Sequence, residues 1–389
     1  MANSKPQRVL AIDAFRGITM LVMIFVNTLA GVRGMPAWMD HAPAGVDGMT
    51  VPDVVFPAFL FIVGMSIPFA AAQRAAEGDT PWRQWRHVLS RAAGLLVLGV
   101  FMVNAEEGYN EAAMGMSIHL WSLLFYACAI LVWAVYRFEN KALAVALRLI
   151  GAAGLLALAL LFRGGADGSL RLAPQWWGIL GLIGWAYLYA SVAFRFTRGS
   201  LTAVALLVLG CTAYYCAAHT VAAPSWFGAQ AENAVHTSIT LCGLLTALIF
   251  FGEARPASRA FGMAAALAAG LAVIAFVLRP AFHISKIDAT PSWALYSSAL
   301  CVLLFAALYW LVDLRHRQRW TAPLRPAAAN PLLTYIIPYI VYALMQYLHL
   351  AFPAVLGAGL PGLLWAAAYA MIVMALAAAL NRMHIKLQL

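Results

Sequence analysis

The chain is divided into apolar stretches of about 17 to 25 residues, the length that an α-helix needs to cross a bilayer. Charged residues, glycine and proline separate about twelve such spans, near residues 10–29, 54–73, 89–104, 118–136, 142–162, 176–194, 200–219, 236–251, 260–278, 292–312, 332–350 and 355–380. With 64% hydrophobic and 10% charged residues, a water-soluble fold would lack a polar surface. We therefore predict an all-α polytopic membrane protein of about ten to twelve helices, with one transmembrane domain over residues 1–389.

The first apolar stretch and the cysteines support this interpretation. The stretch begins at Leu10 and carries Asp13 and Arg16 near its start, unlike the core of a signal peptide, so we expect it to be kept as the first span. Every cysteine lies within an apolar segment: Cys128, Cys211, Cys216, Cys242 and Cys301. We expect them to be small core residues and not a disulfide framework.

The basic residues separate into two sets when twelve spans are assumed. Of the 25 lysines and arginines, all fall on the side of both termini except Arg33, Arg163, Arg171, Arg279 and Lys286. Because lysine and arginine concentrate in cytoplasmic loops, this partition predicts that both termini are cytoplasmic. Topology also explains the net charge of +10, so we expect no nucleic-acid binding.

Three polar residues lie in the first predicted span. Asp13 and Arg16 share one helix face and can pair near the cytoplasmic boundary, which would anchor the helix. Arginine also suits phosphate, so we expect Asp13, Arg16 and the cytoplasmic Arg74 to contribute to a site for a phosphate-bearing ligand. Asn27 lies about 16 Å further along the helix, past the middle of the bilayer. There its amide needs a partner on another helix, or a ligand.

A polar outer segment follows, and it contains His41 and Asp47. Imidazole titrates near neutrality and can act as a base or nucleophile. The predicted outer helix ends collect further histidines, acids and tryptophans, a composition that suits a sugar, although an interfacial tryptophan belt is the alternative. No histidine pair has the spacing of a zinc motif, so we expect no metal. The residues expected to bind substrate are Asp47, Asp53, His119, Lys286 and Asp288. A helix N-cap is the alternative role for Asp53.

Several motifs resemble a known family. They are Ile12-Asp-Ala-Phe-Arg-Gly17, Val26-Asn27, His41-Ala42 and Asp53-Val-Val-Phe-Pro-Ala-Phe-Leu-Phe-Ile-Val-Gly64. Together they resemble the start of the heparan-alpha-glucosaminide N-acetyltransferase family, and most closely its bacterial NagX-type branch. The signature regions are residues 8–72 and 282–335. One departure is that the family usually continues from His-Ala through one residue to Trp-Asn-Gly, whereas this chain has a longer spacing and Val46-Asp47-Gly48.

The resemblance implies a membrane acetyltransferase that takes acetyl from cytosolic acetyl-CoA to an amino sugar presented from the outer side. The family's active histidine and neighbouring asparagine match His41 and Asn27. The pantetheine arm of coenzyme A, about a dozen bonds long, reaches only partway through a core of about 30 Å. We therefore expect the loop with His41 to fold back into the bundle. His41 would deprotonate the sugar ammonium or carry acetyl, and Asn27 would orient it or bind the thioester oxygen.

Two other functions stay open at this stage. An amino-sugar or N-acetylglucosamine transporter would also have about twelve spans, although the chain has no clear repeat halves. An O-acyltransferase of an envelope polysaccharide would use the same donor with a hydroxyl acceptor. In each case we expect a multi-pass protein of the bacterial inner (cytoplasmic) membrane, and a homodimer is compatible with the sequence.

Overall fold

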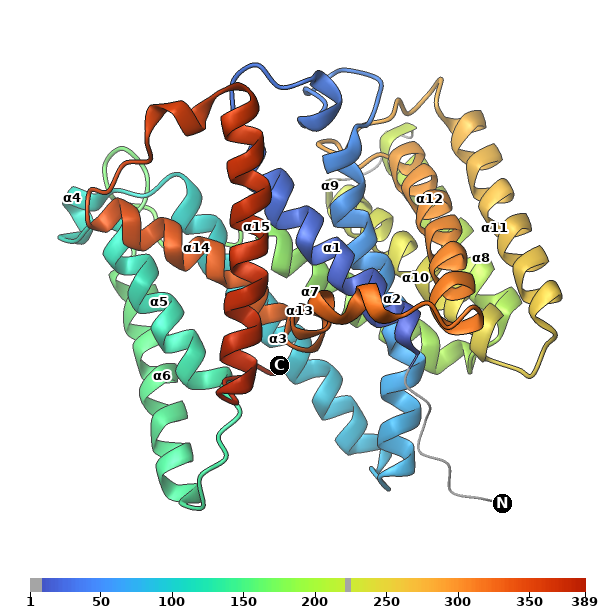
Figure 1. The fold of residues 1–389 in the computed structure, drawn as a ribbon, viewed down its shortest axis with the longest axis horizontal. Coiled ribbons are helices and arrows are strands. Elements are labelled where there is room, and N and C mark those ends of the chain that lie inside the picture. Colours follow the sequence, from blue (N-terminus) through green and yellow to red (C-terminus); the bar gives the residue numbers. More distant parts are fainter. Residues whose placement is uncertain (1–8, 221–224) are drawn as a thin grey trace.

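The computed structural model describes residues 9–220 and 225–389, and over them the chain is helical with no strand (Figure 1). The long helices are α1 (Leu10–Leu29), α2 (Val51–Ala76), α3 (Pro81–Glu106), α5 (Ile118–Trp133), α6 (Lys141–Leu161), α7 (Gly178–Thr197), α8 (Leu201–Thr220), α10 (Ala231–Phe251), α11 (Ala257–Leu278), α12 (Pro291–Tyr309), α14 (Pro331–Tyr347) and α15 (Gly359–Arg382). Short helices α4 (Glu111–Met114), α9 (Ser225–Gly228) and α13 (Arg325–Ala329) lie in the connections.

All twelve predicted spans coincide with one of these long helices, so the prediction of an all-α polytopic membrane protein is confirmed. Ten helices in the described part of the chain are long and apolar enough to cross a membrane. An eleventh span is formed if Arg319–Ala329 and Pro331–Tyr347, bent by 76° at their junction, are taken as one. Helix α5 is apolar but has only 16 residues. At 1.5 Å per residue it is about 24 Å long, which is shorter than the hydrocarbon core.

The connecting segments form two ends of the bundle, as the alternating topology predicts. At one end, Gly48 N–H donates to the Ile284 carbonyl at 3.0 Å, and the backbone of Arg33 pairs with the chain near α15. At the other end, the first N–H groups of α1 donate to the Asp313 carboxylate at 2.8 and 3.2 Å, and Val135 N–H donates to Lys386. The cytoplasmic side of the termini stays a prediction, and Lys5 and Arg8 of the predicted inner set lie outside the described residues.

Glycines fix the helices that build the site. A Cβ atom on Gly64 of α2 would overlap the Thr240 carbonyl of α10, and one on Gly243 of α10 would overlap the Phe61 carbonyl. A Cβ atom on Gly99 of α3 would likewise overlap the backbone of α7. Small residues allow such close backbone approach, which stabilises helix pairs in lipid where the hydrophobic effect does not. As a result α2 is held against the central α10, whose span is 83% buried, and α7 is held against α3.

Candidate active site

His41 lies in the loop between α1 and α2, and its side chain packs against the first turn of α2. Asp53, in that turn, is 1% exposed, and its Oδ1 atom lies 2.6 Å from His41 Nδ1. Its Oδ2 atom accepts hydrogen bonds from the backbone N–H groups of Ala42 at 3.1 Å and Thr50 at 3.0 Å, and Thr50 completes a capping box with it. The N-cap of α2 is thus Thr50 and not Asp53 as expected; Asp53 is the N3 acid of the capping box, and the same carboxylate orients His41.

This pairing determines the chemistry available to the imidazole. A carboxylate next to Nδ1 favours the tautomer with the proton on Nδ1, so the lone pair lies on Nε2. A histidine oriented in this way can take a proton or attack an acyl carbon through Nε2. Lys286 Nζ lies 3.3 Å from Nδ1 and 3.5 Å from Nε2. Burial lowers the pKa of Lys286, while the charge of Asp53 opposes that shift.

His41 and Lys286 line a hollow of about 410 Å³, partly open to solvent, which we call the outer cavity. Asn27 of α1 also lines it, and its exposed side chain makes no hydrogen bond within the described part of the chain. The remaining lining residues are Met23, Val26, Pro52, Val55, Phe56, Phe59, Ile179, Tyr335 and Tyr339. The structure thus brings together three predicted site residues, and the loop holds His41 against the first turn of α2 with its side chain 39% exposed.

Tyr335 and Tyr339 of α14 were missed by the sequence reasoning. Their hydroxyl groups lie 3.3 Å apart, and the exposed carboxyl group of Glu106, at the end of α3, acts electrostatically on both. A pair of tyrosines four residues apart, flanking Pro338 in an apolar span, is a signal that could have indicated them. They give the outer cavity two phenol groups.

Three other residues predicted to bind substrate lie near the outer end but do not line this cavity. Asp47 pairs with Arg279 at 2.9 Å and accepts a hydrogen bond from Ile284 N–H, and these two contacts lower its pKa. Asp288 accepts a hydrogen bond from the Ser285 hydroxyl. His119 packs edge-on against Tyr342, with ring centroids 6.3 Å apart. Asp47 therefore ties the His41 loop to the segment that carries Lys286.

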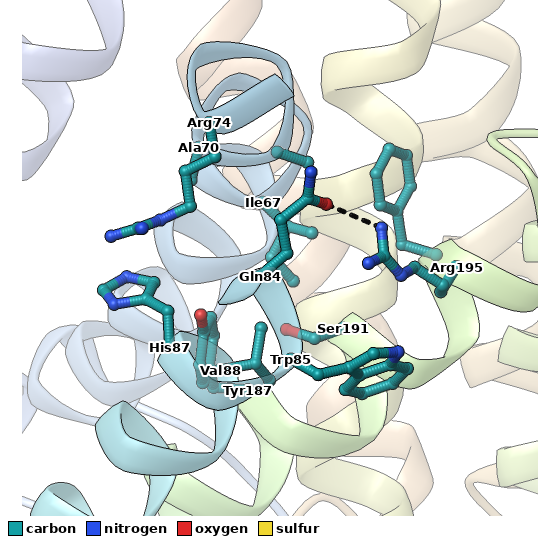
Figure 2. A pocket seen from close by; sticks show the side chains of 12 residues that line it. Ile67, Ala70, Arg74, Gln84, Trp85, His87, Val88, Tyr187, Ser191 and Arg195 are labelled. Carbon is teal, nitrogen blue, oxygen red and sulfur yellow. Dashed lines mark hydrogen bonds between the residues drawn. The ribbon is translucent and has the colours of Figure 1, made fainter. Parts of the chain in front are cut away.

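The residues predicted to bind phosphate lie in two places at the end of the bundle that is predicted to be cytoplasmic, which we call the inner end. Asp13 and Arg16 pair at 3.5 Å, and Arg16 also donates to the Ser66 hydroxyl at 2.9 Å and the Ala328 carbonyl at 3.3 Å. Arg74 pairs with Asp79 at 2.9 Å. Arg74 also lines a second hollow, the inner cavity, of about 500 Å³ between α2, α3 and α7 (Figure 2).

No group of three or more His, Cys, Asp or Glu side chains within residues 9–220 and 225–389 is arranged to hold a metal ion. The outer cavity presents imidazole, ammonium, amide and phenol groups.

Known proteins match different lengths of the chain. The model of a family described as a domain of unknown function, DUF5009, matches residues 8–227, which include Asn27, His41 and Asp53. Human heparan-alpha-glucosaminide N-acetyltransferase is 33% identical over 102 residues, which are 26% of this chain and 15% of the human protein. The mouse protein of the same name is 31% identical over 102 residues, with the same shares. The chain thus matches only about one-seventh of the length of these relatives.

Proposed function

Because the chain belongs to the DUF5009 family, whose description leaves its function open, we propose a function from the outer cavity and from the local similarity to N-acetyltransferases. The proposed function is acetyl transfer from acetyl-CoA to the amine of an amino sugar. The observation that carries it is the Asp53–His41 pair, 2.6 Å apart, in one cavity with Asn27 and Lys286. This set supplies a base or nucleophile, a neutral donor and a cation around one small space.

Each group has a role in the proposed transfer. The acceptor nitrogen attacks the thioester carbon, the new N–C bond forms, and His41 Nε2 takes the proton that the nitrogen loses. Asn27 N–H and the Lys286 ammonium stabilise the negative charge that develops on the carbonyl oxygen. The C–S bond then breaks, and the proton on His41 neutralises the departing thiolate. In a two-step variant, Nε2 attacks the thioester carbon first, the C–S bond breaks and coenzyme A leaves as the thiolate. The amine then attacks the acetyl carbon, the bond to Nε2 breaks, and Nε2 takes the proton that the amine loses.

The two substrates would reach His41 from opposite ends. The donor enters from the inner end, where Arg16, positioned by Asp13, and Arg74 are proposed contacts for its phosphates. The acceptor enters from the outer end, where Asp47, His119 and Asp288 surround the cavity. We place this activity in the bacterial inner membrane, with residues 1–389 acting as one domain.

The test is transfer of labelled acetyl from acetyl-CoA to glucosamine by the purified full chain in nanodiscs. We expect N-acetylglucosamine as the product and a rate about 10² to 10⁴ times lower for His41→Ala, the range of a lost general base. His219→Ala is the matched control, because this exposed outer histidine stacks on Tyr215, away from the cavity. Full activity of His41→Ala would disprove its role.

Product analysis and a separate uptake measurement distinguish the two competing functions. A hydroxyl acceptor would give an ester that is cleaved by mild base, whereas an amide survives it. Sugar uptake into sealed vesicles that persists without acetyl-CoA would instead identify a transporter.

A further inference from the structure

The inner cavity combines cationic and aromatic side chains at the inner ends of three helices. Its walls include Arg74 of α2, Trp85 of α3, and Tyr187, Ser191 and Arg195 of α7 (Figure 2). Helix α7 packs against both α2 and α3, so the cavity lies where the three helices meet.

Ser191 has a hydroxyl group that lacks a partner. The residue is 6% exposed, and its buried Oγ atom has no hydrogen-bond partner among the described residues. Figure 2 shows this oxygen directed between Trp85 and Val88, into the group of lining side chains. Buried hydroxyl groups are nearly always hydrogen-bonded, because leaving one unpaired costs free energy. An acceptor oxygen of a bound ligand would satisfy it.

The charged groups of the cavity favour an anion. Arg195 uses two of its nitrogens, to Gln84 Oε1 at 2.7 Å and the Pro81 carbonyl at 3.4 Å, and its guanidinium lies 5.5 Å over the Trp85 ring. Arg74 contacts Asp79 through one nitrogen. Each guanidinium has five N–H donors, so both keep donors for a ligand, and two arginines outweigh one aspartate. Arginine and aromatic rings together suit a phosphate joined to a flat ring.

The geometry of α2 links the two cavities. Residues 52, 56, 59, 63, 67, 70 and 74 are three or four apart and form one face of the helix, and all but residue 63 line one cavity or the other. The nearest lining residues are Phe59 and Ile67 on α2, and Ile179 and Tyr187 on α7. Both separations are about 12 Å at 1.5 Å per residue. A chain of about a dozen bonds, advancing about 1.2 Å per bond, covers about 14 Å.

We propose that the inner cavity binds a phosphorylated nucleotide. Resting on the proposed function, this nucleotide is the adenosine phosphate end of the donor, and its pantetheine arm follows the α2–α7 seam to His41. Arg74 and Arg195 bind phosphate oxygens, Trp85 or Tyr187 stacks on the base, and Ser191 donates to an acceptor atom of the ligand. Arg16, which donates to Ser66 of α2, does not line this cavity and remains a proposed contact for a second phosphate of the same donor.

Binding is measured by isothermal titration of coenzyme A and of 3′,5′-ADP into the full chain in phosphatidylcholine nanodiscs. We expect Arg195→Gln and Ser191→Ala each to raise the Kd of both ligands at least tenfold. Arg86→Gln is the matched control, an exposed arginine of α3 that does not line the cavity, and it should change Kd less than twofold. Ser191→Ala removes the unpaired hydroxyl and so should not lower the Tm of the free protein, which separates lost binding from misfolding.

Three outcomes overturn the proposal. One is an equal Kd for Arg195→Gln, Ser191→Ala and Arg86→Gln. Another is that coenzyme A binding is lost when phosphatidylglycerol replaces phosphatidylcholine and that 3′,5′-ADP does not compete with coenzyme A. The cavity would then be a site for an anionic lipid. The third is transfer from acetyl-pantetheine, which lacks the nucleotide, that is as efficient as transfer from acetyl-CoA.

The proposed function has a separate readout. His41→Ala should lower the rate of transfer about 10² to 10⁴ times and leave the Kd of coenzyme A unchanged. Nucleotide binding that depends on Arg195, together with no acetyl transfer to any amine by the wild-type chain, would refute the acetyltransferase and keep the binding site.

Discussion

Replacing Asp53 by asparagine should change the tautomer of His41 while it keeps the shape and the backbone contacts of the site. The asparagine oxygen can take the place of Oδ2 and accept the backbone N–H groups of Ala42 and Thr50. Its NH₂ group then faces His41 Nδ1, which was 2.6 Å from the carboxylate. Two donors cannot face each other, so Nδ1 must become the acceptor and the proton must move to Nε2. The nitrogen that should take the acceptor's proton is thereby blocked.

The size of the loss follows from the same contact. Asp53 also stabilises the imidazolium formed during transfer, and two unit charges about 4 Å apart interact by about 4 kcal/mol at an effective dielectric constant of about 20. That corresponds to about 10³ in rate, so we expect kcat to fall between about 10² and 10⁴. The N-cap Thr50 and the acceptor at Oδ2 are kept, so the cost in stability should be less than the roughly 1 kcal/mol of a lost cap.

The assay is steady-state acetyl transfer with kcat and KM measured separately for each substrate. If Asp53 had a purely structural role, Asp53→Asn would lower Tm and raise the Kd of coenzyme A. If Asp53 positions His41, the substitution lowers kcat alone. Asp53→Asn should also add little to the defect of His41→Ala, because both act through one imidazole. A kcat within about threefold of wild type, or full additivity of the two variants, would refute the reasoning.

Three further predictions follow from single contacts. Burial lowers the pKa of Lys286 below its usual 10.5, so Lys286 loses its charge, and activity should fall, as pH rises through that lowered pKa. Lys286→Arg stays charged and should remove this loss at high pH from the profile of kcat against pH. Gly64→Val should lower Tm and detergent-stable yield, because its side chain would overlap the α10 backbone, whereas Gly262→Val, with no atom near its Cβ position, should not. Glu106→Gln should raise the KM of an amine acceptor at least fivefold and leave that of acetyl-CoA unchanged, if its carboxylate attracts the substrate ammonium; an equal change in both would contradict that role.

The sequence predicted the helices because each span carries its own signal, an apolar run of membrane length. It predicted Asn27 and His41 as site residues through a motif. It also predicted an N-cap role for Asp53, whereas the structure makes Thr50 the N-cap and Asp53 the N3 acid of the capping box. The hydrogen bond from Asp53 to His41 could not be predicted in the same way. It depends on how the intervening loop, residues 42–50, leads into α2, and Asp47 fixes the path of that loop through Arg279, far along the chain.

The two cavities show a second limit. Tyr335 lines His41's cavity because α14 is bent by 76° from the preceding helical segment, and Arg195 lines the same cavity as Arg74 because α7 packs against both α2 and α3. Such contacts are set by crossing geometry between helices distant in sequence. Single polar residues in long apolar spans carry no local pattern that identifies their partners.

Helix α2 gives the strongest structural reason to favour group transfer over transport. One of its faces is fixed to α10 by Gly64 and Gly243, where no side chain separates the backbones. Its other face lines both cavities, so their spacing is set by a single helix that cannot easily move against its neighbour. A transporter must open one end of its site while it closes the other, which requires such helices to rock. An enzyme that joins a donor from the inner end to an acceptor from the outer end instead needs a constant distance between its two subsites, and a helix pinned along its length provides it.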